Sequence, residues 1–223
     1  MGSLSNGGAS VKTRSYRSPR RAAQARETRR HLLEVAARLF AERGYVGTSF
    51  DAVAAAAGVG RATVFAHFPT KSALLKAAYD VTLVGDDEPV ALPDRPESLA
   101  VRAEPDPARF LDGYAGIVTG VGRRLSPIYE AIRGAAHADP EAAVVWRTIN
   151  DERRMGGRNV VAGIVGRNAL RPGRDPGAAA DIVYALADPG LYHLLVRQCG
   201  WTHRAYTAWL AEALKRELLW EPR

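Results

Sequence analysis

Residues 48–71 read TSFDAVAAAAGVGRATVFAHFPTK, and this stretch decides the fold. Its first part has the spacing i, i+3, i+4, i+7 of a helix with one apolar face, shown by Phe50, Val53, Ala54 and Ala57. Gly58 ends this helix, because glycine has no Cβ to oppose a left-handed C-terminal residue. A second short helix follows the turn. This layout is typical of a helix-turn-helix DNA-binding motif.

The second short helix has an inner and an outer side. Val64 and Phe68 are four residues apart and can point inward together. The other side chains are then free to meet DNA; they are Arg61, Ala62, Thr63, Phe65 and His67. At the start of the first helix, Thr48 and Asp51 resemble a capping box. We therefore expect that helix to begin at about Ser49, with Thr48 as its cap.

Two flanking segments complete a small helical domain over residues 25–80. Upstream, a longer helix is predicted from about Ala25 to Arg43, closed by Gly44, on the spacing of Leu32, Val35, Ala36, Leu39 and Phe40. Downstream, Pro69 interrupts the chain and Thr70 can cap a new helix. The apolar face of that helix consists of Leu74, Leu75, Ala78 and Tyr79. The sequence therefore predicts a three-helix DNA-binding domain joined to a further helix.

The run from Arg29 to Tyr79, with GYVGTSFDAVAAAAGVGRATVFAHFPTKSALL at its centre, resembles the DNA-binding domain of TetR-family transcriptional regulators. The resemblance implies an all-α homodimer that binds double-stranded, palindromic operator DNA. It also implies repression that ends when a small-molecule effector enters the larger C-terminal domain.

The same resemblance implies a role for each matching residue. Thr48 would bind a phosphate at the start of the second helix of the domain. Arg61, Ala62 and Thr63 would face base edges or the flanking backbone, and Phe65, His67 and Lys71 would line the phosphates. The chain departs from the family pattern at Gly60, a weaker cap than serine or threonine, and at Phe65, where a tyrosine hydroxyl is often found.

Charge is distributed unevenly along the chain. Residues 1–80 hold 13 Lys and Arg against 5 Asp and Glu, whereas residues 81–223 hold 18 against 19. A basic excess beside the motif favours a polyanionic partner, although a basic tail can also serve only solubility. Residues 1–24 are rich in Gly, Ser, Lys and Arg with little to anchor a fold, so we expect a disordered basic arm there.

Several classes of protein are excluded by what the sequence lacks. It has neither a secretory signal nor a run of about 18 apolar residues, so we expect a cytoplasmic protein with no membrane partner. The five histidines are scattered, and Cys199 is the only cysteine, which leaves no metal-binding pattern and no disulfide. No nucleophile elbow or Walker loop occurs. We therefore expect no enzyme activity, no metal and no cofactor.

The C-terminal part is predicted to be helical as well. Residues 81–105 resemble a linker or irregular loop, and residues 106–223 form the effector-binding and dimerisation domain. Helices are predicted over residues 106–122, 126–137, 140–169, 177–199 and 203–220, each bounded by Pro or Gly.

Two sets of residues in this domain are candidates for binding. An apolar pocket with a few polar groups is predicted from Tyr114, Ile117, Tyr129, Trp146, Ile149 and Arg153. The dimer interface is predicted from Tyr184, Leu191, Leu195, Tyr206, Trp209, Leu210 and Leu214, with packing inside one subunit as the alternative.

Together these features predict a sequence-specific transcriptional regulator. The alternative is an architectural DNA-binding protein with little sequence preference and no effector.

Overall fold

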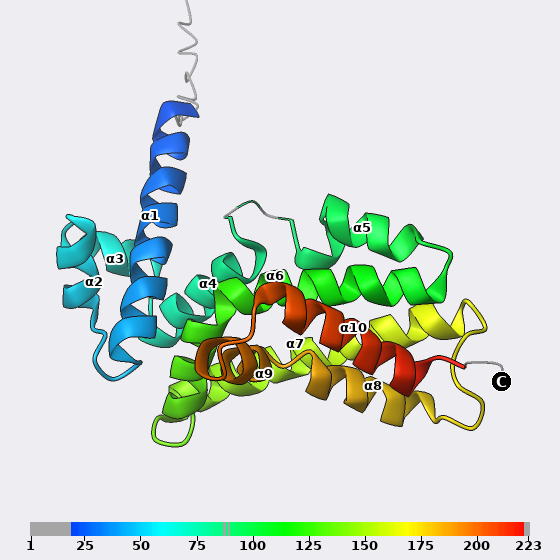
Figure 1. The fold of residues 1–223 in the computed structure, drawn as a ribbon. Coiled ribbons are helices and arrows are strands. Elements are labelled where there is room, and N and C mark those ends of the chain that lie inside the picture. Colours follow the sequence, from blue (N-terminus) through cyan, green and yellow to red (C-terminus); the bar gives the residue numbers. More distant parts are fainter. Residues whose placement is uncertain (1–18, 87, 89, 221–223) are drawn as a thin grey trace, which may run out of the picture.

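The computed structural model describes residues 19–86, 88 and 90–220, and it is all-α (Figure 1). The only β pairing among these residues is an isolated bridge between Leu170 and Leu219. The expected fold class is therefore confirmed. The helices are α1 (Pro19–Arg43), α2 (Phe50–Ala57), α3 (Arg61–His67), α4 (Lys71–Val84), α5 (Pro96–Ala103), α6 (Pro107–Ala135), α7 (Pro140–Val165), α8 (Pro176–Leu186), α9 (Pro189–Tyr192) and α10 (His203–Leu218).

The N-terminal helices end where local signals place them. The backbone of Gly58 is left-handed, with φ 66°, and closes α2. The Thr70 hydroxyl accepts a hydrogen bond from the backbone N–H of Ala73 and so caps α4. The start of α1 was predicted wrongly: the helix begins at Pro19, so residues 19–24 are helical and not part of a disordered arm. The rest of the predicted arm, residues 1–18, lies outside the described residues.

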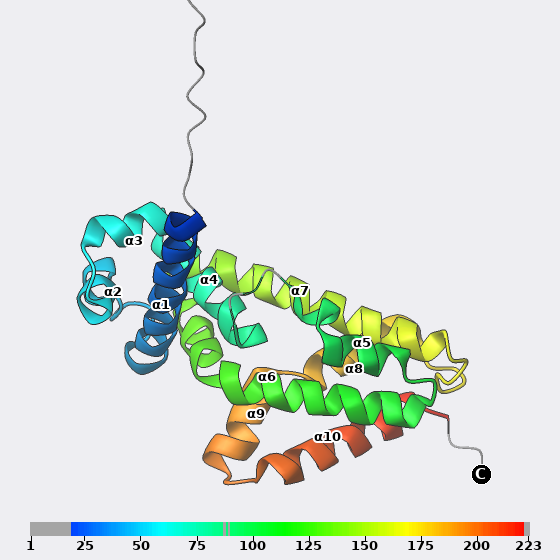
Figure 2. The same ribbon diagram turned by 90° about the horizontal axis from the view of Figure 1, so that it is seen from above.

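Two clusters of buried side chains hold the fold together. The first, the proximal core, joins residues 32–79 to residues 125–149. The second, the distal core, joins residues 110–115 and 160–164 to residues 179–219. Figures 1 and 2 show α1, α2 and α3 at one end of an elongated body that contains α6, α7, α8 and α10. Because α6 and α7 contribute to both cores, the DNA-binding helices do not pack as an isolated unit.

Helix α6 runs unbroken through Pro127, contrary to the predicted break between residues 122 and 126. A proline inside a helix leaves the carbonyl four residues earlier without its usual donor. Here that carbonyl belongs to Arg123, and the Arg197 guanidinium donates to it at 3.4 Å. A long-range hydrogen bond therefore compensates for the missing N–H.

The segment predicted as an irregular linker, residues 81–105, is more ordered than expected. Helix α4 continues to Val84, a 3-10 turn covers Leu92–Asp94, and α5 occupies Pro96–Ala103. The Arg95 guanidinium donates to both carboxylate oxygens of Asp86, at 2.8 and 2.5 Å, and fixes the connection between α4 and α5. This bidentate pair also lowers the pKa of Asp86.

The single helix predicted over residues 177–199 is interrupted. Asp188 caps α9 through the backbone N–H of Gly190, and Pro189 occupies the first helical position. Proline disfavours helical geometry at the residue before it, which explains the break after α8. A π-helical segment, His193–Gln198, then continues the chain. Helices α7 and α10 also end a few residues earlier than predicted, at Val165 and Leu218.

In the described part of the chain, no helix is both long enough and apolar enough to cross a membrane.

Candidate nucleic-acid interface

The inner side of α3 packs against the proximal core and against α2. Val64 is fully buried and Phe68 is 2% exposed, so both point into the proximal core as predicted. The rings of Phe50 and Phe65 meet edge to face with centroids 4.6 Å apart, which links α2 to α3. The orientation of α3 is therefore set by contacts on its inner side, and its outer side stays available.

Most predicted DNA-contacting residues of α3 lie on or beside that outer side. Arg61, Ala62 and Phe65 are exposed, while Thr63 and His67 are half-buried. The Arg61 guanidinium donates to Asp51 at 3.0 Å and lies over the Phe65 ring at 5.2 Å. These two contacts position the guanidinium at the start of α3, where the Asp51 carboxylate offsets part of its charge. Gly60 precedes α3 without a side-chain cap, as the sequence suggested.

The prediction for Thr48 needs correction. The residue is 1% exposed, and its hydroxyl donates toward the backbone carbonyls of Leu39 and Gly44, at 3.1 and 2.9 Å. The cap of α2 is the Ser49 side chain, which accepts from the backbone N–H of Ala52. A buried hydroxyl already paired with carbonyls cannot reach a phosphate without rearrangement. Thr48 therefore joins the end of α1 to the start of α2.

Lys71 lies at the start of α4 and is half-buried. Its ammonium group is 4.1 Å from the centroid of the Tyr45 ring. Burial lowers the pKa of Lys71, and the negative charges of Asp139 and Glu141 oppose that shift. Burial, together with the same two carboxylates, raises the pKa of Tyr45 to about 12. The phosphate contact predicted for Lys71 would therefore occur where the DNA-binding helices meet the start of α7.

A further basic residue near α3 was missed by the sequence analysis. The Arg29 guanidinium of α1 lies over the Phe68 ring, 4.7 Å from its centroid. This brings a positive charge from α1 to the C-terminal end of α3. No local pattern marks Arg29 among the other arginines of α1, because only the packing of α1 against α3 distinguishes it.

Comparison with known proteins agrees with this geometry. A profile of the bacterial regulatory proteins of the tetR family matches residues 32–78. Residues 32–78 thus match the DNA-binding domain of this family. A stretch of 59 residues of this chain is 42% identical to the HTH-type transcriptional regulator AcrR of Shigella flexneri. That match spans 26% of this chain and 27% of that regulator's length.

Solved structures extend the similarity to most of the chain. NalD of Pseudomonas aeruginosa, the secondary repressor of the MexAB-OprM multidrug efflux pump, superimposes with a TM-score of 0.62 at 25% identity, covering 87% of this chain and 98% of NalD. A transcriptional regulator of Saccharomonospora viridis, solved in complex with choline, gives a TM-score of 0.65 at 18% identity, covering 87% of this chain and 99% of the other. At 18% identity the second likeness concerns the fold alone.

The C-terminal helices contain a polar cluster centred on Arg153. The guanidinium donates to the Tyr129 hydroxyl and the Asn150 amide oxygen through Nη1, both at 2.9 Å. Through Nη2 it donates to the backbone carbonyl of Tyr184 at 2.9 Å and pairs with Asp188 at 2.8 Å. Arg153 therefore ties α6 and α7 to the end of α8.

The predicted effector residues divide into two groups. Tyr129 and Trp146 meet at a ring-centroid distance of 5.1 Å, and Tyr129 and Ile149 belong to the proximal core. Tyr114 packs against the distal core, and burial raises its pKa to about 12 while the charge of Arg153 opposes the rise. Ile117, also on α6, is half-buried. Arg153 lies near both groups, but its hydrogen bonds are used within the protein.

Part of the predicted dimer interface is internal to the subunit. Tyr206, Leu210 and Leu214 are fully buried in the distal core, so their side chains cannot form a contact surface. The apolar spacing along α10 therefore identifies the face that packs inside the subunit, and not a face that contacts a second subunit. The other four residues predicted for the interface are half-buried, and their contact with a second subunit remains a prediction. They are Tyr184, Leu191, Leu195 and Trp209. The Tyr184 hydroxyl also donates to Asn150 at 2.7 Å, which adds it to the Arg153 cluster.

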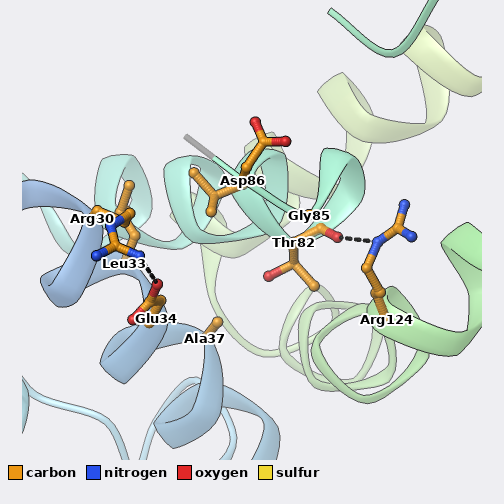
Figure 3. A pocket seen from close by; sticks show the side chains of 9 residues that line it. Arg30, Leu33, Glu34, Ala37, Thr82, Gly85, Asp86 and Arg124 are labelled. Atoms are coloured by element: carbon orange, nitrogen blue, oxygen red, sulfur yellow. Dashed lines mark hydrogen bonds and ion pairs between the residues drawn. The ribbon is translucent and has the colours of Figure 1, made fainter. Parts of the chain in front are cut away.

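A cleft of about 400 Å³ marks where α1, α4 and α6 meet (Figure 3). Leu33, Ala37 and Val81 supply apolar lining, and charged groups stand around them. Arg124 of α6 donates to the backbone carbonyls of Thr82 and Leu83, at 3.3 and 2.8 Å, and so holds the last turn of α4. The DNA-binding helices therefore meet the C-terminal helices through α1 and α4, and Arg124 fixes the end of α4 to α6.

Proposed function

We propose that this protein is a sequence-specific transcriptional repressor that binds a palindromic operator as a homodimer and is released by a small-molecule effector. The observation that carries the proposal is the outer side of α3, which is exposed and basic at its start while Val64 and Phe68 fix its inner side. A helix supported in this way can enter the major groove of DNA. The basic excess of residues 1–80 adds attraction to phosphates.

The proposed dimer is argued from the symmetry of a palindrome, and effector binding from proteins of similar fold. A two-fold dimer would match the two halves of a palindrome, with the remaining half-buried residues of the predicted interface at its contact. Repression is the role named for NalD, and choline is the ligand named for the Saccharomonospora viridis regulator. A small molecule in the C-terminal domain would release DNA only by preferring a geometry that does not fit the operator. Helix α4 is the connection through which that preference would reach α3.

Footprinting on genomic DNA tests the proposal. We expect protection of a palindromic site, with half-sites about one helical turn apart. Broad protection without a preferred sequence would instead favour the alternative of an architectural DNA-binding protein. Sedimentation of the free and DNA-bound protein would show whether two subunits occupy each site.

Thr63→Ala and Lys71→Ala are expected to affect DNA binding differently. If Thr63 contacts a base edge, as the proposal has it, loss of that contact weakens operator binding by about 1–3 kcal/mol per half-site. Lys71 would contact a phosphate, so Lys71→Ala should weaken operator and random DNA alike and reduce the slope of log affinity against log salt by about 0.9 for each subunit bound. Fluorescence anisotropy over a salt series measures both effects.

Lys215→Ala is the matched control for Lys71→Ala. Lys215 is a lysine of α10 that pairs with Asp112 and Glu212, far along the chain from the DNA-binding helices. The Lys215→Ala variant should leave the slope of log affinity against log salt unchanged. If Thr63→Ala weakened operator and random DNA equally, α3 would not be reading bases through Thr63.

A further inference from the structure

The outer side of α3 carries an apolar stripe as well as a charge. Ala62, Phe65 and Ala66 follow the spacing i, i+3, i+4 and therefore share one face of the helix. All three are exposed, and 44% of the Phe65 surface is accessible. Between the polar side chains that flank it, this stripe offers methyl groups and a ring edge but no hydrogen-bond donor or acceptor.

The Phe65 ring is held in place on two sides. Phe50 supports it edge to face at 4.6 Å, and the Arg61 guanidinium lies 5.2 Å from its centroid. Arg61 is itself held by Asp51. Contact with Phe50 therefore holds one side of the Phe65 ring against α2, and the other part of the ring is exposed.

We infer that the stripe Ala62–Phe65–Ala66 recognises thymine C5 methyl groups in the major groove of each half-site. The inference rests on the proposed function and specifies which base feature the protein reads. For Phe65 it replaces the phosphate contact that the resemblance implied. Thymine alone among the four bases presents a methyl group in the major groove, and alanine and phenylalanine side chains contact it through apolar surface. The basic excess of residues 1–80 fits DNA as the occupant of this face, and the Arg61 guanidinium beside the stripe can exchange Asp51 for a phosphate.

Deoxyuridine tests the inference at the level of one methyl group. Each thymine of the footprinted operator is replaced in turn by deoxyuridine, which keeps base pairing and the phosphate backbone and removes only the methyl. We expect at least one position in each half-site at which this replacement weakens binding about four-fold, the effect of exposing one buried methyl group. Fluorescence anisotropy at a single salt concentration gives the affinities.

Protein variants show whether the stripe is the partner of that methyl. In Phe65→Ala or Ala62→Gly, the operators with thymine and with deoxyuridine at the sensitive position should bind with nearly equal affinity. The protein side of the methyl contact is already missing in these variants. Ala162→Gly, the same change at an exposed position of α7, is the matched control and should retain the full penalty. Circular dichroism checks that each variant stays helical.

Two results would overturn the inference while leaving the proposed function intact. One is a protected palindrome whose deoxyuridine forms all bind with unchanged affinity. The other is a penalty that persists in full in both Phe65→Ala and Ala62→Gly. A protein that protects no preferred DNA sequence would overturn the proposed function, and the inference with it.

Discussion

Arg153→Met is expected to lower the free energy of unfolding by about 3 kcal/mol, because it removes one partner of a buried ion pair. The Arg153 side chain is 12% exposed and that of Asp188 is 29% exposed. The substitution keeps most of the side-chain length but leaves Asp188 without its counter-charge and the carbonyl of Tyr184 without a donor. Urea denaturation followed by circular dichroism measures the change.

Asp188→Asn provides the second half of a double-mutant cycle. The asparagine oxygen can still accept from the backbone N–H of Gly190 and cap α9, but the unpaired charge is gone. We therefore expect the double variant Arg153→Met/Asp188→Asn to be more stable than Arg153→Met alone. Arg174→Ala, which breaks a more exposed pair with Glu217, should cost less than about 1 kcal/mol. Equal losses for Arg153→Met and Arg174→Ala would show that the cluster is not a structural link.

Gly157→Ala is expected to destabilise the protein by about 1–3 kcal/mol through overpacking. A Cβ at Gly157 would lie 2.8 Å from the backbone carbonyl oxygen of Ala180, which is closer than non-bonded carbon and oxygen can approach. The oxygen belongs to the backbone of α8, so α7 and α8 would have to separate to relieve the contact. Thermal and urea denaturation measure the loss.

Gly156→Ala is a control on the neighbouring residue of the same helix. A Cβ at Gly156 would meet nothing within 4 Å. Alanine has the higher helix propensity, so this variant should gain about 0.5–1 kcal/mol. Opposite signs for the two substitutions would establish close packing of α7 on α8. A loss at both positions would mean that α7 needs glycine for another reason.

The sequence alone predicted the helix-turn-helix because its signals act over a few residues. The apolar spacing of α2, the left-handed turn at Gly58 and the cap at Thr70 all involve neighbours within one or two helical turns, and all three are present. The same locality explains an error. Thr48 and Ser49 are both side chains that can cap a helix, and local sequence does not show that the Thr48 hydroxyl would turn toward Leu39 and Gly44 instead.

The C-terminal helices were predicted in outline, but their joins and contacts were not. Pro127 indicated a break, yet α6 continues through it, and Arg197, 74 residues from Arg123, donates to the carbonyl that the proline leaves without a donor. The apolar face of α10 indicated an interface in the same way, although Tyr206 and Leu210 fill the distal core of one subunit. Periodicity shows that a face is buried, but it does not identify the surface that covers it.

The sequence by itself thus determined which segment forms α2, the turn and α3, since backbone propensity and capping depend on adjacent residues. Only the tertiary structure decided which side chains stay accessible and which charges pair. The Tyr129 hydroxyl and the Asp188 carboxylate are 59 residues apart and meet at 2.9 Å. Such contacts depend on how α6, α7 and α8 pack, because a hydrogen bond requires its two atoms to lie within about 3 Å of each other.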